Sequence, residues 1–409
     1  MGVMKMDYNL KGVIFGDRDV IQDDEYLPEI EELLKFLIDR KITPIILSND
    51  KEYNRLQLRE KLCQKYPSLR WYIAGADANT TQTLHKKPSD KLVSHVLSNL
   101  SLDNNECIFI GNSDVDMITA VNSKILFLNA IWYEQKTEYG FTFEKPKDIA
   151  RFIDVFCLRE HLWGYEIKDG NLEYYALGIY GKKEEKYDYS HDFLAATKFG
   201  RGHPDFWMKY LLSAVYFSGL HKQIDYISGY PGHEQGSRFD MEVTSITIFA
   251  KCFNKKYLPD LIQRHTTSQK SSYARAQGIS IDCTNQINTI KLNQYPMKSD
   301  NDKYRNCPLT KKKTVLVIDD ICTQGYSLET ARLYIEKTGA RVILLSFLKT
   351  IWKDYEKIEA IGDFQSPFQA NTLNPLATTK YRFWDYVVKK DSYQEIRSKL
   401  AEYENWNDW

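Results

Sequence analysis

The sequence predicts an α/β protein built from two doubly wound parallel sheets. Short apolar runs recur along the chain, and polar residues follow them directly, as in GVIFGDRD, ITPIILSND and TVLVIDD. Amphipathic stretches such as LETARLYIEK lie between the runs. This alternation is typical of buried parallel strands connected by helices. Because ligands of such sheets bind at the carboxyl ends of the strands, the polar residues there are the candidate site residues.

The stretch 314–331, TVLVIDDICTQGYSLETA, has the most specific pattern in the chain. We expect a buried strand from Val315 to Asp319, then a loop, then an amphipathic helix. Backbone amides at a helix start, with hydroxyls and a glycine, suit a phosphate monoester. Two adjacent carboxylates suit the vicinal hydroxyls of a ribose, or a magnesium ion bound through them. The candidate binding residues of this loop are Asp319, Asp320, Thr323, Gln324, Gly325 and Ser327.

Length and composition set the frame for these motifs. With 409 residues and 43% hydrophobic content, the chain should form two or three globular domains. Its 55 basic and 55 acidic residues balance, which argues against electrostatic binding of nucleic acid. No apolar run is long enough for a membrane span and the N-terminus lacks a signal-peptide core, so we expect a cytoplasmic protein. Seven cysteines without a C-x-x-C pair suggest neither a disulfide framework nor a zinc site.

The first domain is predicted to span residues 1–155. A short strand from Gly12 to Phe15 runs into Asp17 and Asp19, and two carboxylates at this spacing suit nucleophilic attack on a phosphoryl group and proton transfer. Further polar residues follow later apolar runs or begin a helix: Ser48, Lys87, Asn112 and Asp116.

This series resembles the haloacid dehalogenase (HAD) phosphatases. The resemblance implies that Asp17 is the nucleophile, Asp19 the general acid and base, and Ser48 and Lys87 the ligands of the transferred phosphoryl group. It implies a Mg²⁺ ion held by Asp17, Asp19, Asn112 and Asp116. The gaps between the motifs house no cap domain, so the site should be open.

Two departures from the HAD pattern leave an alternative. The glycine expected after Asp19 is missing, and Asn112 stands where an acid is usual. A register through Val20 would place Gly16 at the nucleophile position. The alternative is therefore a HAD scaffold kept for folding or for binding a phosphate.

The second domain is predicted to span residues 160–409. A helix within 144–161 should end the first domain, and a β-hairpin around Asp169-Gly170 should begin the second. Helices follow, broken between Gly200 and Pro204. The C-terminal tail holds Phe383, Trp384 and Tyr386, which would form core or a hood over a base, and closes with a helix over SYQEIRSKLAEYENW.

The order of residues in 314–331 closely resembles the phosphoribosyl pyrophosphate (PRPP) loop of type I phosphoribosyltransferases. The layout from residue 198 to 349 resembles the ComF branch, although SGYPGHEQGSRFD departs from the usual P-V-P and R-G-F-N-Q patterns. The resemblance implies that Arg264 and Arg275 contact pyrophosphate; solvated loop charges are the alternative.

Together the resemblances suggest a bifunctional enzyme of nucleotide metabolism. A Mg²⁺-dependent phosphoribosyltransferase, a glycosyltransferase, would join PRPP to a nitrogenous base, and a HAD-type hydrolase would turn the nucleoside monophosphate into a nucleoside. The alternative is a non-catalytic PRPP- or nucleotide-sensing scaffold with a degenerate HAD domain. Small molecules are the expected partners, a homo-oligomer stays open, and the sequence does not identify the base.

Overall fold

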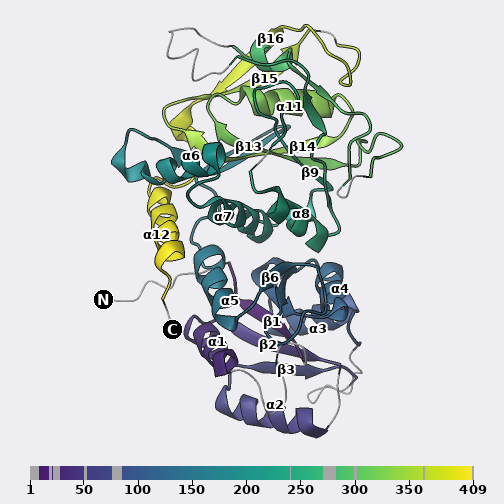
Figure 1. Ribbon diagram of the computed structural model, residues 1–409, viewed down its shortest axis with the longest axis vertical. Helices are drawn as coiled ribbons and strands as arrows, with labels where there is room; N and C mark the ends of the chain where they lie inside the picture. Colours follow the sequence, from purple (N-terminus) through teal and green to yellow (C-terminus); the bar gives the residue numbers. More distant parts are fainter. Residues whose placement is uncertain are drawn as a thin grey trace.

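The protein contains two six-stranded sheets, one above the other in Figure 1. The computed structural model describes residues 9–17, 21, 28–49, 53–75, 85–239, 241–269, 282–298, 302–362 and 364–407. Asp19, Val20 and Arg275 lie outside these ranges. Buried apolar side chains form one continuous core cluster that runs through both sheets.

The first sheet has the order β3-β2-β1-β4-β5-β6, and all its pairings are parallel. This is the doubly wound α/β topology that the sequence predicts, and its order reverses between β1 and β4. Its strands are β1 Gly12–Gly16, β2 Thr43–Ser48, β3 Arg70–Ile73, β4 Cys107–Gly111, β5 Leu126–Ala130 and β6 Phe141–Phe143. Its helices are α1 Pro28–Asp39, α2 Tyr53–Lys65, α3 Asp90–Leu100, α4 Asp114–Asn122 and α5 Pro146–Phe152.

The second sheet has the order β10-β9-β13-β14-β8-β7, parallel except for the edge strand β7. Its strands are β7 Tyr165–Asp169, β8 Leu172–Tyr180, β9 Tyr226–Gly229, β10 Lys256–Tyr257, β13 Thr314–Cys322 and β14 Arg341–Thr350. Two antiparallel ribbons join it: β11 Ile262–Arg264 with β12 Ile290–Leu292, and β15 Tyr355–Ile361 with β16 Pro375–Tyr381. The helices are α6 Tyr189–Phe199, α7 Pro204–Phe217, α8 Val243–Cys252, α10 Thr284–Ile287, α11 Tyr326–Glu336 and α12 Ser392–Asn405.

Local sequence signals explain several of these elements. The predicted hairpin is confirmed: β7 pairs with β8 from Asp169↔Leu172 onwards, and Gly170 takes a positive φ of 58° in the turn. Pro204 begins α7 after Gly200 has ended α6 with a left-handed backbone, as the predicted break requires.

One strand boundary was predicted wrongly. β13 continues through Asp319 and Asp320 to Cys322, whereas the sequence predicts that the strand ends at Asp319. The pairing with β14 explains the extension, because Ile321 still lies opposite Leu348 and Cys322 opposite Lys349. The two acids are therefore held by the sheet rather than by the loop that follows it.

Helices α7 and α8 lie between the two sheets (Figure 1). Helix α8 packs on β9 and β10 of the second sheet and also on β5, β6 and α4 of the first. The Tyr216 hydroxyl donates to the Asn104 carbonyl at 2.8 Å. The two sheets thus share one helical layer.

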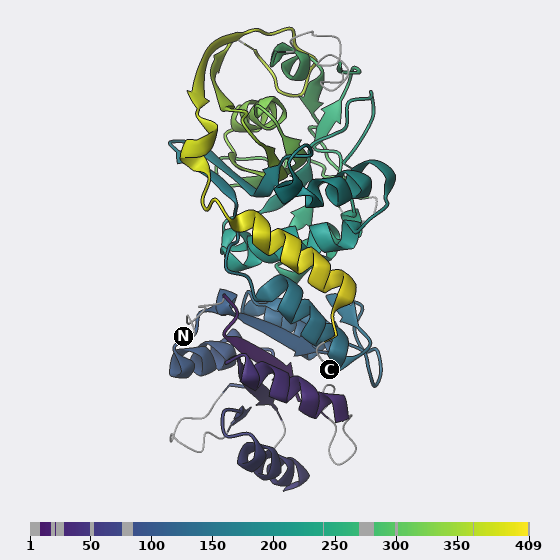
Figure 2. The ribbon, with the colours of Figure 1, turned by 90° about the vertical axis from the view of Figure 1, so that its left-hand side faces the viewer.

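The C-terminal helix α12 runs back from the second sheet toward the first (Figure 2). Just beyond its end, the Trp406 indole donates to Asp154 at 2.9 Å, and Asp154 also accepts two hydrogen bonds from Arg40 at 2.6 and 2.8 Å. The Trp406 ring lies edge-on to Phe36 of α1. The tail was assigned to the second domain, yet its end is part of the first domain's surface. Among the described residues, no helix combines the length and hydropathy needed to cross a membrane.

His221 makes the shared layer sensitive to acid. Its ring is 1% exposed and lies against Tyr216 and Phe253, with centroids 4.8 and 4.5 Å away. Burial lowers the pKa of His221 from 6.5 to about 4. The unfolded state binds the proton on His221 more readily than the folded state does. The contribution of neutral His221 to the free energy of unfolding is therefore fully present above the pKa of the unfolded state, and it is lost as the pH falls toward the pKa of the folded state.

We therefore expect His221→Phe, which keeps a ring but cannot titrate, to lose less stability than wild type between pH 7 and pH ~4.5. The difference in the free energy of unfolding should be roughly 2 to 3 kcal/mol, from about 1.4 kcal/mol per pKa unit. Urea unfolding of both proteins at the two pH values measures it. Equal acid sensitivity would contradict the assignment.

Candidate functional sites

The first candidate site lies at the carboxyl edge of the first sheet. Asp17 follows β1 directly, and Ser48 is the last residue of β2, the neighbouring strand. The Ser48 hydroxyl donates a short hydrogen bond to the Asp17 carboxylate, which is 5% exposed. The sequence-predicted nucleophile and phosphoryl ligand are therefore neighbours, at the position where the strand order reverses.

Asp116 and Lys87 form a buried ion pair at the same edge. The Lys87 ammonium lies 2.6 Å from Asp116 Oδ1, and the two side chains are 7% and 1% exposed. Asp116 is in the first turn of α4, where the N-cap Ser113 accepts from its backbone amide at 3.2 Å. Such a pair would be costly to bury without a further interaction partner.

Two glycines let the Asp116 carboxylate reach the strand ends. A Cβ at Gly16 would lie 2.3 Å from Asp116 Oδ2, and a Cβ at Gly111 would lie 2.5 Å from Asp116 Cβ. Gly16 is the last residue of β1, and Asp17 follows it. Asp116 can lie this close to the ends of β1 and β4 only because both positions lack a side chain.

The sequence analysis missed Asn49, which fixes the backbone of Lys87. Its Oδ1 accepts from the Lys87 amide at 2.8 Å, and its Nδ2 donates to the Lys87 carbonyl at 3.1 Å. Asn49 directly follows Ser48, so one segment places the hydroxyl and orients the lysine. The signal was present in ITPIILSND, but only the distant Lys87 reveals its role.

Asn112 has a structural contact in addition to its predicted role. The residue follows β4 and is fully buried, as expected at the sheet edge, where its Nδ2 donates to the Glu134 carbonyl and its Oδ1 accepts from the Lys136 amide at 3.0 Å. The amide side chain therefore holds the loop after β5. Its Oδ1 has a second lone pair, so a metal contact by Asn112 stays a prediction.

Oxygen donors for a cation are present at this edge, although the described residues contain no group of three or more acidic, histidine or cysteine side chains placed to hold a metal ion. Asp17 and Asp116 supply two carboxylates, the hard oxygen ligands that Mg²⁺ prefers. The third predicted carboxylate, Asp19, lies outside the described residues.

The second candidate site lies at the carboxyl edge of the second sheet. Asp319 is half-buried there and Asp320 is exposed. The Asp319 carboxylate accepts a hydrogen bond from the Asp320 amide at 2.9 Å. Local burial and the adjacent Asp320 carboxylate raise the pKa of Asp319 above its ordinary value, while Arg264 opposes the shift. Two close acids of this kind would gain from a cation or from hydroxyl donors.

The loop after β13 has the backbone that a phosphate cradle needs. Gly325 takes a φ of 89° and caps α11, and a Cβ on it would lie 2.6 Å from the Tyr355 ring. Any larger residue would therefore meet both a strained backbone and a steric clash. Ser327 lies in the first turn of α11. Its hydroxyl is therefore in the same helical turn as the first backbone amides, which lack partners within the helix.

Thr323 and Gln324 differ in their surroundings. The Thr323 hydroxyl lies 3.2 Å from the Thr350 hydroxyl at the end of β14. The Gln324 amide donates to Tyr326 Oη and Glu356 Oε1, both at 3.2 Å. The Gln324 side chain is therefore held by Tyr326 of α11 and Glu356 of β15, and its contact with substrate stays a prediction.

Arg264 also has a different role from the predicted one. Its guanidinium is 3% exposed and donates to the Gly232 carbonyl at 2.9 Å and to Gln286 Oε1 at 3.0 Å. It also bonds Thr289 Oγ1 and lies 5.3 Å from the Tyr230 ring centroid. Arg264 thus holds the glycine-rich loop after β9, and its burial separates the guanidinium from a ligand in solvent. The other predicted arginine, Arg275, lies outside the described residues.

The tail aromatics divide between core and surface. Phe383 is 2% exposed and stacks on Tyr165, with centroids 5.6 Å apart, so it belongs to the core. Trp384 is 37% exposed and meets the more exposed Trp352 edge-on at 4.9 Å. Trp352 lies two residues beyond the end of β14 and was not predicted.

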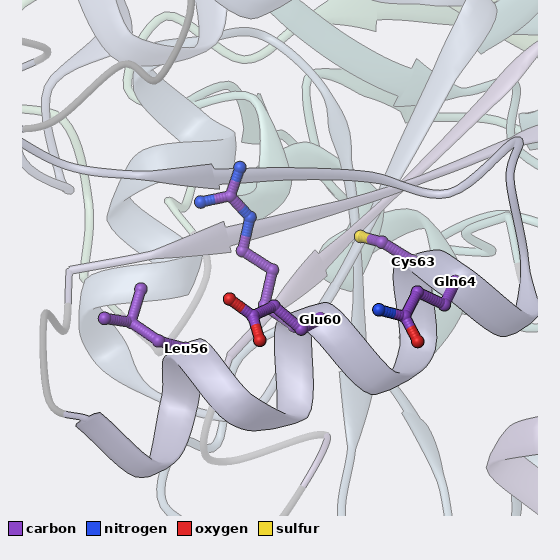
Figure 3. A pocket seen from close by; sticks show the side chains of 5 residues that line it. Leu56, Glu60, Cys63 and Gln64 are labelled. Carbon is purple, nitrogen blue, oxygen red and sulfur yellow. The ribbon is translucent and has the colours of Figure 1, made fainter.

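A separate hollow lies along α2 (Figure 3). It is lined by Leu56, Arg59, Glu60, Cys63 and Gln64. None of these residues belongs to either candidate site. The candidate chemistry therefore lies at the sheet edges and not in this hollow.

Comparisons with known proteins give matches among solved structures. No family model and no curated protein matches the chain. A HAD-superfamily hydrolase from Ehrlichia chaffeensis is 26% identical, with 32% of this chain and 60% of that chain covered and a TM-score of 0.26. D,D-heptose 1.7-bisphosphate phosphatase from B. bronchiseptica, complexed with magnesium and phosphate, is 11% identical, with 34% and 96% covered and a TM-score of 0.29. A 4-nitrophenylphosphatase from Thermotoga maritima is 11% identical, with 35% and 97% covered and a TM-score of 0.30.

Proposed function

We propose that the first domain hydrolyses phosphate monoesters and that the second binds PRPP and transfers its phosphoribosyl group to a nitrogenous base. One observation carries the first part. Asp17, Ser48, Lys87 and Asp116 come from four separate segments, and two direct polar contacts join them in pairs at one sheet edge. A scaffold kept only for folding would not need these charges to be buried together.

The chemistry of the first site follows from the side chains. The Asp17 carboxylate attacks phosphorus, the bond to the leaving oxygen breaks, and an acyl phosphate forms on Asp17. Ser48 and Lys87 hold the phosphoryl oxygens, with Lys87 oriented by Asn49. Water then cleaves the acyl phosphate. Asp19 is assigned the proton transfers of both steps on resemblance alone.

A divalent cation fits the first site. Asp116 presents its carboxylate against Gly16 and Gly111, where a side chain would fill the space. Asp17 and Asp116 would hold Mg²⁺, which when bound offsets the negative charge shared by phosphate and carboxylate. A carboxylate can accept several bonds, so the contact of Asp116 with Lys87 does not exhaust it.

The second activity is supported by the arrangement around β13. Two acids at the strand end suit ribose hydroxyls, and the Gly325 turn with the start of α11 suits the 5-phosphate. Arg264 fixes the glycine-rich loop after β9, the strand next to β13, so this loop is held beside the same edge. Pyrophosphate would leave from that side. The exposed pair Trp352 and Trp384 offers ring faces for an aromatic base.

We expect Asp319→Asn combined with Asp320→Asn to weaken binding of PRPP with Mg²⁺ by a factor of about 10 or more, since charge-assisted hydrogen bonds are lost. Isothermal titration calorimetry measures this directly. Asp302→Asn combined with Asp391→Asn changes the net charge equally at exposed positions and should bind as wild type does. Unchanged affinity in the Asp319/Asp320 variant would rule out the proposed ribose site.

The alternative is a protein that senses PRPP without turning it over. The same loop would then bind ligand while the first domain stays inactive. The phosphatase assay separates the two, because a sensing protein would bind PRPP and release no phosphate from any monoester.

A further inference from the structure

Lys349 is a fully buried lysine beside the phosphate loop. It lies near the end of β14, opposite Cys322 of β13, and its side chain is 0% exposed. Its ammonium donates to the carbonyl of Thr323, the first residue of the loop, and to the carbonyl of Lys353 in the segment between β14 and β15. One buried cation therefore joins the two segments that border the candidate ribose and base positions.

Among the described residues, no carboxylate forms an ion pair with Lys349, and its ammonium donates to carbonyl oxygens instead. The rings of Tyr165 and Phe383 lie with their centroids 5.6 Å from the ammonium, so their faces provide part of its solvation. Burial lowers the pKa of Lys349 to about 8; Cys322 and Asp354 oppose this shift, and the Lys353 ammonium adds to it.

We infer that Lys349 is a positioning residue that fixes the phosphate loop through the Thr323 carbonyl and couples it to the segment 351–354. This inference rests on the proposed PRPP binding. The segment carries Trp352, whose φ of 60° is unusual for a bulky residue. Hydrogen bonds hold the residues on either side of it: the Ile351 amide donates to the Tyr180 carbonyl, and the Lys353 carbonyl accepts from Lys349. Lys349 would thus keep the phosphate cradle and the exposed Trp352 in one fixed geometry before the ligand arrives.

The physical reason is the high cost of a buried ammonium. Such a group is retained only where it makes strong hydrogen bonds, and here both partners are backbone carbonyls of the two segments. If the ammonium is removed, two partly buried carbonyls lose their donor and the segments can relax toward water. The loop would then lose conformational entropy when the ligand binds, and this loss lowers the affinity.

Lys349→Met tests this role because it keeps a chain of similar length and removes the donors. We expect its affinity for ribose 5-phosphate with Mg²⁺ to fall by a factor of about 10 or more, as for the loss of charge-assisted hydrogen bonds. Lys390→Met is the matched control: it also replaces a lysine, but its side chain is exposed and belongs to neither segment, so affinity should remain within about twofold. Calorimetry measures both variants, with circular dichroism to confirm their folding.

The pH profile of the wild type gives a second test that does not depend on a folded variant. Affinity should fall as the pH rises through about 8, since the neutral amine is a weaker donor. A purely structural lysine would leave this profile flat. A flat profile between pH 7 and pH ~10, or a folded Lys349→Met that binds like wild type, would overturn the inference. Wild type that binds neither ribose 5-phosphate nor PRPP would instead refute the proposed function itself.

Discussion

Replacing Asp17 by asparagine is expected to lower hydrolysis of phosphate monoesters about 1,000-fold or more, because the amide removes the attacking nucleophile. The fold should survive, since asparagine has the same shape and can still bond the Ser48 hydroxyl. Release of 4-nitrophenol from 4-nitrophenyl phosphate in the presence of Mg²⁺ measures the loss. Magnesium removal by a chelator should have a similar effect in wild type if the two carboxylates hold the ion.

Asp114→Asn is the matched control for Asp17→Asn. Asp114 lies in the same turn of α4 as Asp116 but is exposed, so the charge change is equal while the site keeps its side chains. This variant should keep activity near that of wild type. Equal activity in Asp17→Asn and wild type would show that another group attacks phosphorus, or that the activity comes from elsewhere in the chain.

Replacing Glu329 by alanine is expected to destabilise the second domain by about 3 to 5 kcal/mol, the usual cost of leaving one partner of a buried ion pair uncompensated. Glu329 is fully buried and accepts from Arg332, from the Tyr355 hydroxyl at 2.8 Å and from the Ile358 amide at 2.9 Å. Because the Tyr355 ring also packs on Gly325, the loss should loosen the loop after β13 as well. Urea unfolding and PRPP calorimetry report the two effects.

The surface pair of Glu32 and Lys35 provides the control for this prediction. Both side chains are about half exposed, at 46% and 48%, and they interact at 2.7 Å on α1. Glu32→Ala should leave the unfolding midpoint close to that of wild type, because solvent screens such pairs. If Glu329→Ala unfolds at the same urea concentration as Glu32→Ala, the buried network does not stabilise the domain.

The sequence predicted the sheets and the edge residues well because their signals are local. Apolar runs marked the strands, and the first polar residue after a run, such as Asp17 after β1, identified the edge. Gly325 was identifiable because a turn before a helix demands its backbone freedom.

The partners of side chains in loops could not be predicted in the same way. The sequence alone gives no partner for the side chains of Arg264 and Gln324. In the structure Arg264 donates to the Gly232 carbonyl and Gln324 donates to Glu356, and both partners are far away in the chain. Asn112 was assigned from its position in a motif, whereas the loop after β5 determines its contacts. Lys349 looked like an ordinary strand residue, because its burial depends on Tyr165 and Phe383 from distant segments.

The association of the two sheets is also a non-local property. Helix α8 covers strands of both sheets, and Trp406 at the end of the chain reaches Asp154 and α1. A C-terminal helix was expected, but nothing in its own periodicity indicates a contact some 250 positions earlier in the sequence. Domain limits assigned along the sequence do not describe a contact in which the end of the second domain packs on the first.

We propose that one chain makes a nucleotide at its second site and dephosphorylates it at its first. Incubating wild type and Asp17→Asn with PRPP, Mg²⁺ and a panel of bases, followed by chromatography of the products, tests this most directly. Wild type should release nucleoside and phosphate. Asp17→Asn should accumulate the nucleoside monophosphate, because Asp17 lies at the first sheet and its loss leaves the transferase site on the second sheet intact. Nucleotide accumulating equally in both proteins, or no nucleotide with any base in either, would contradict it.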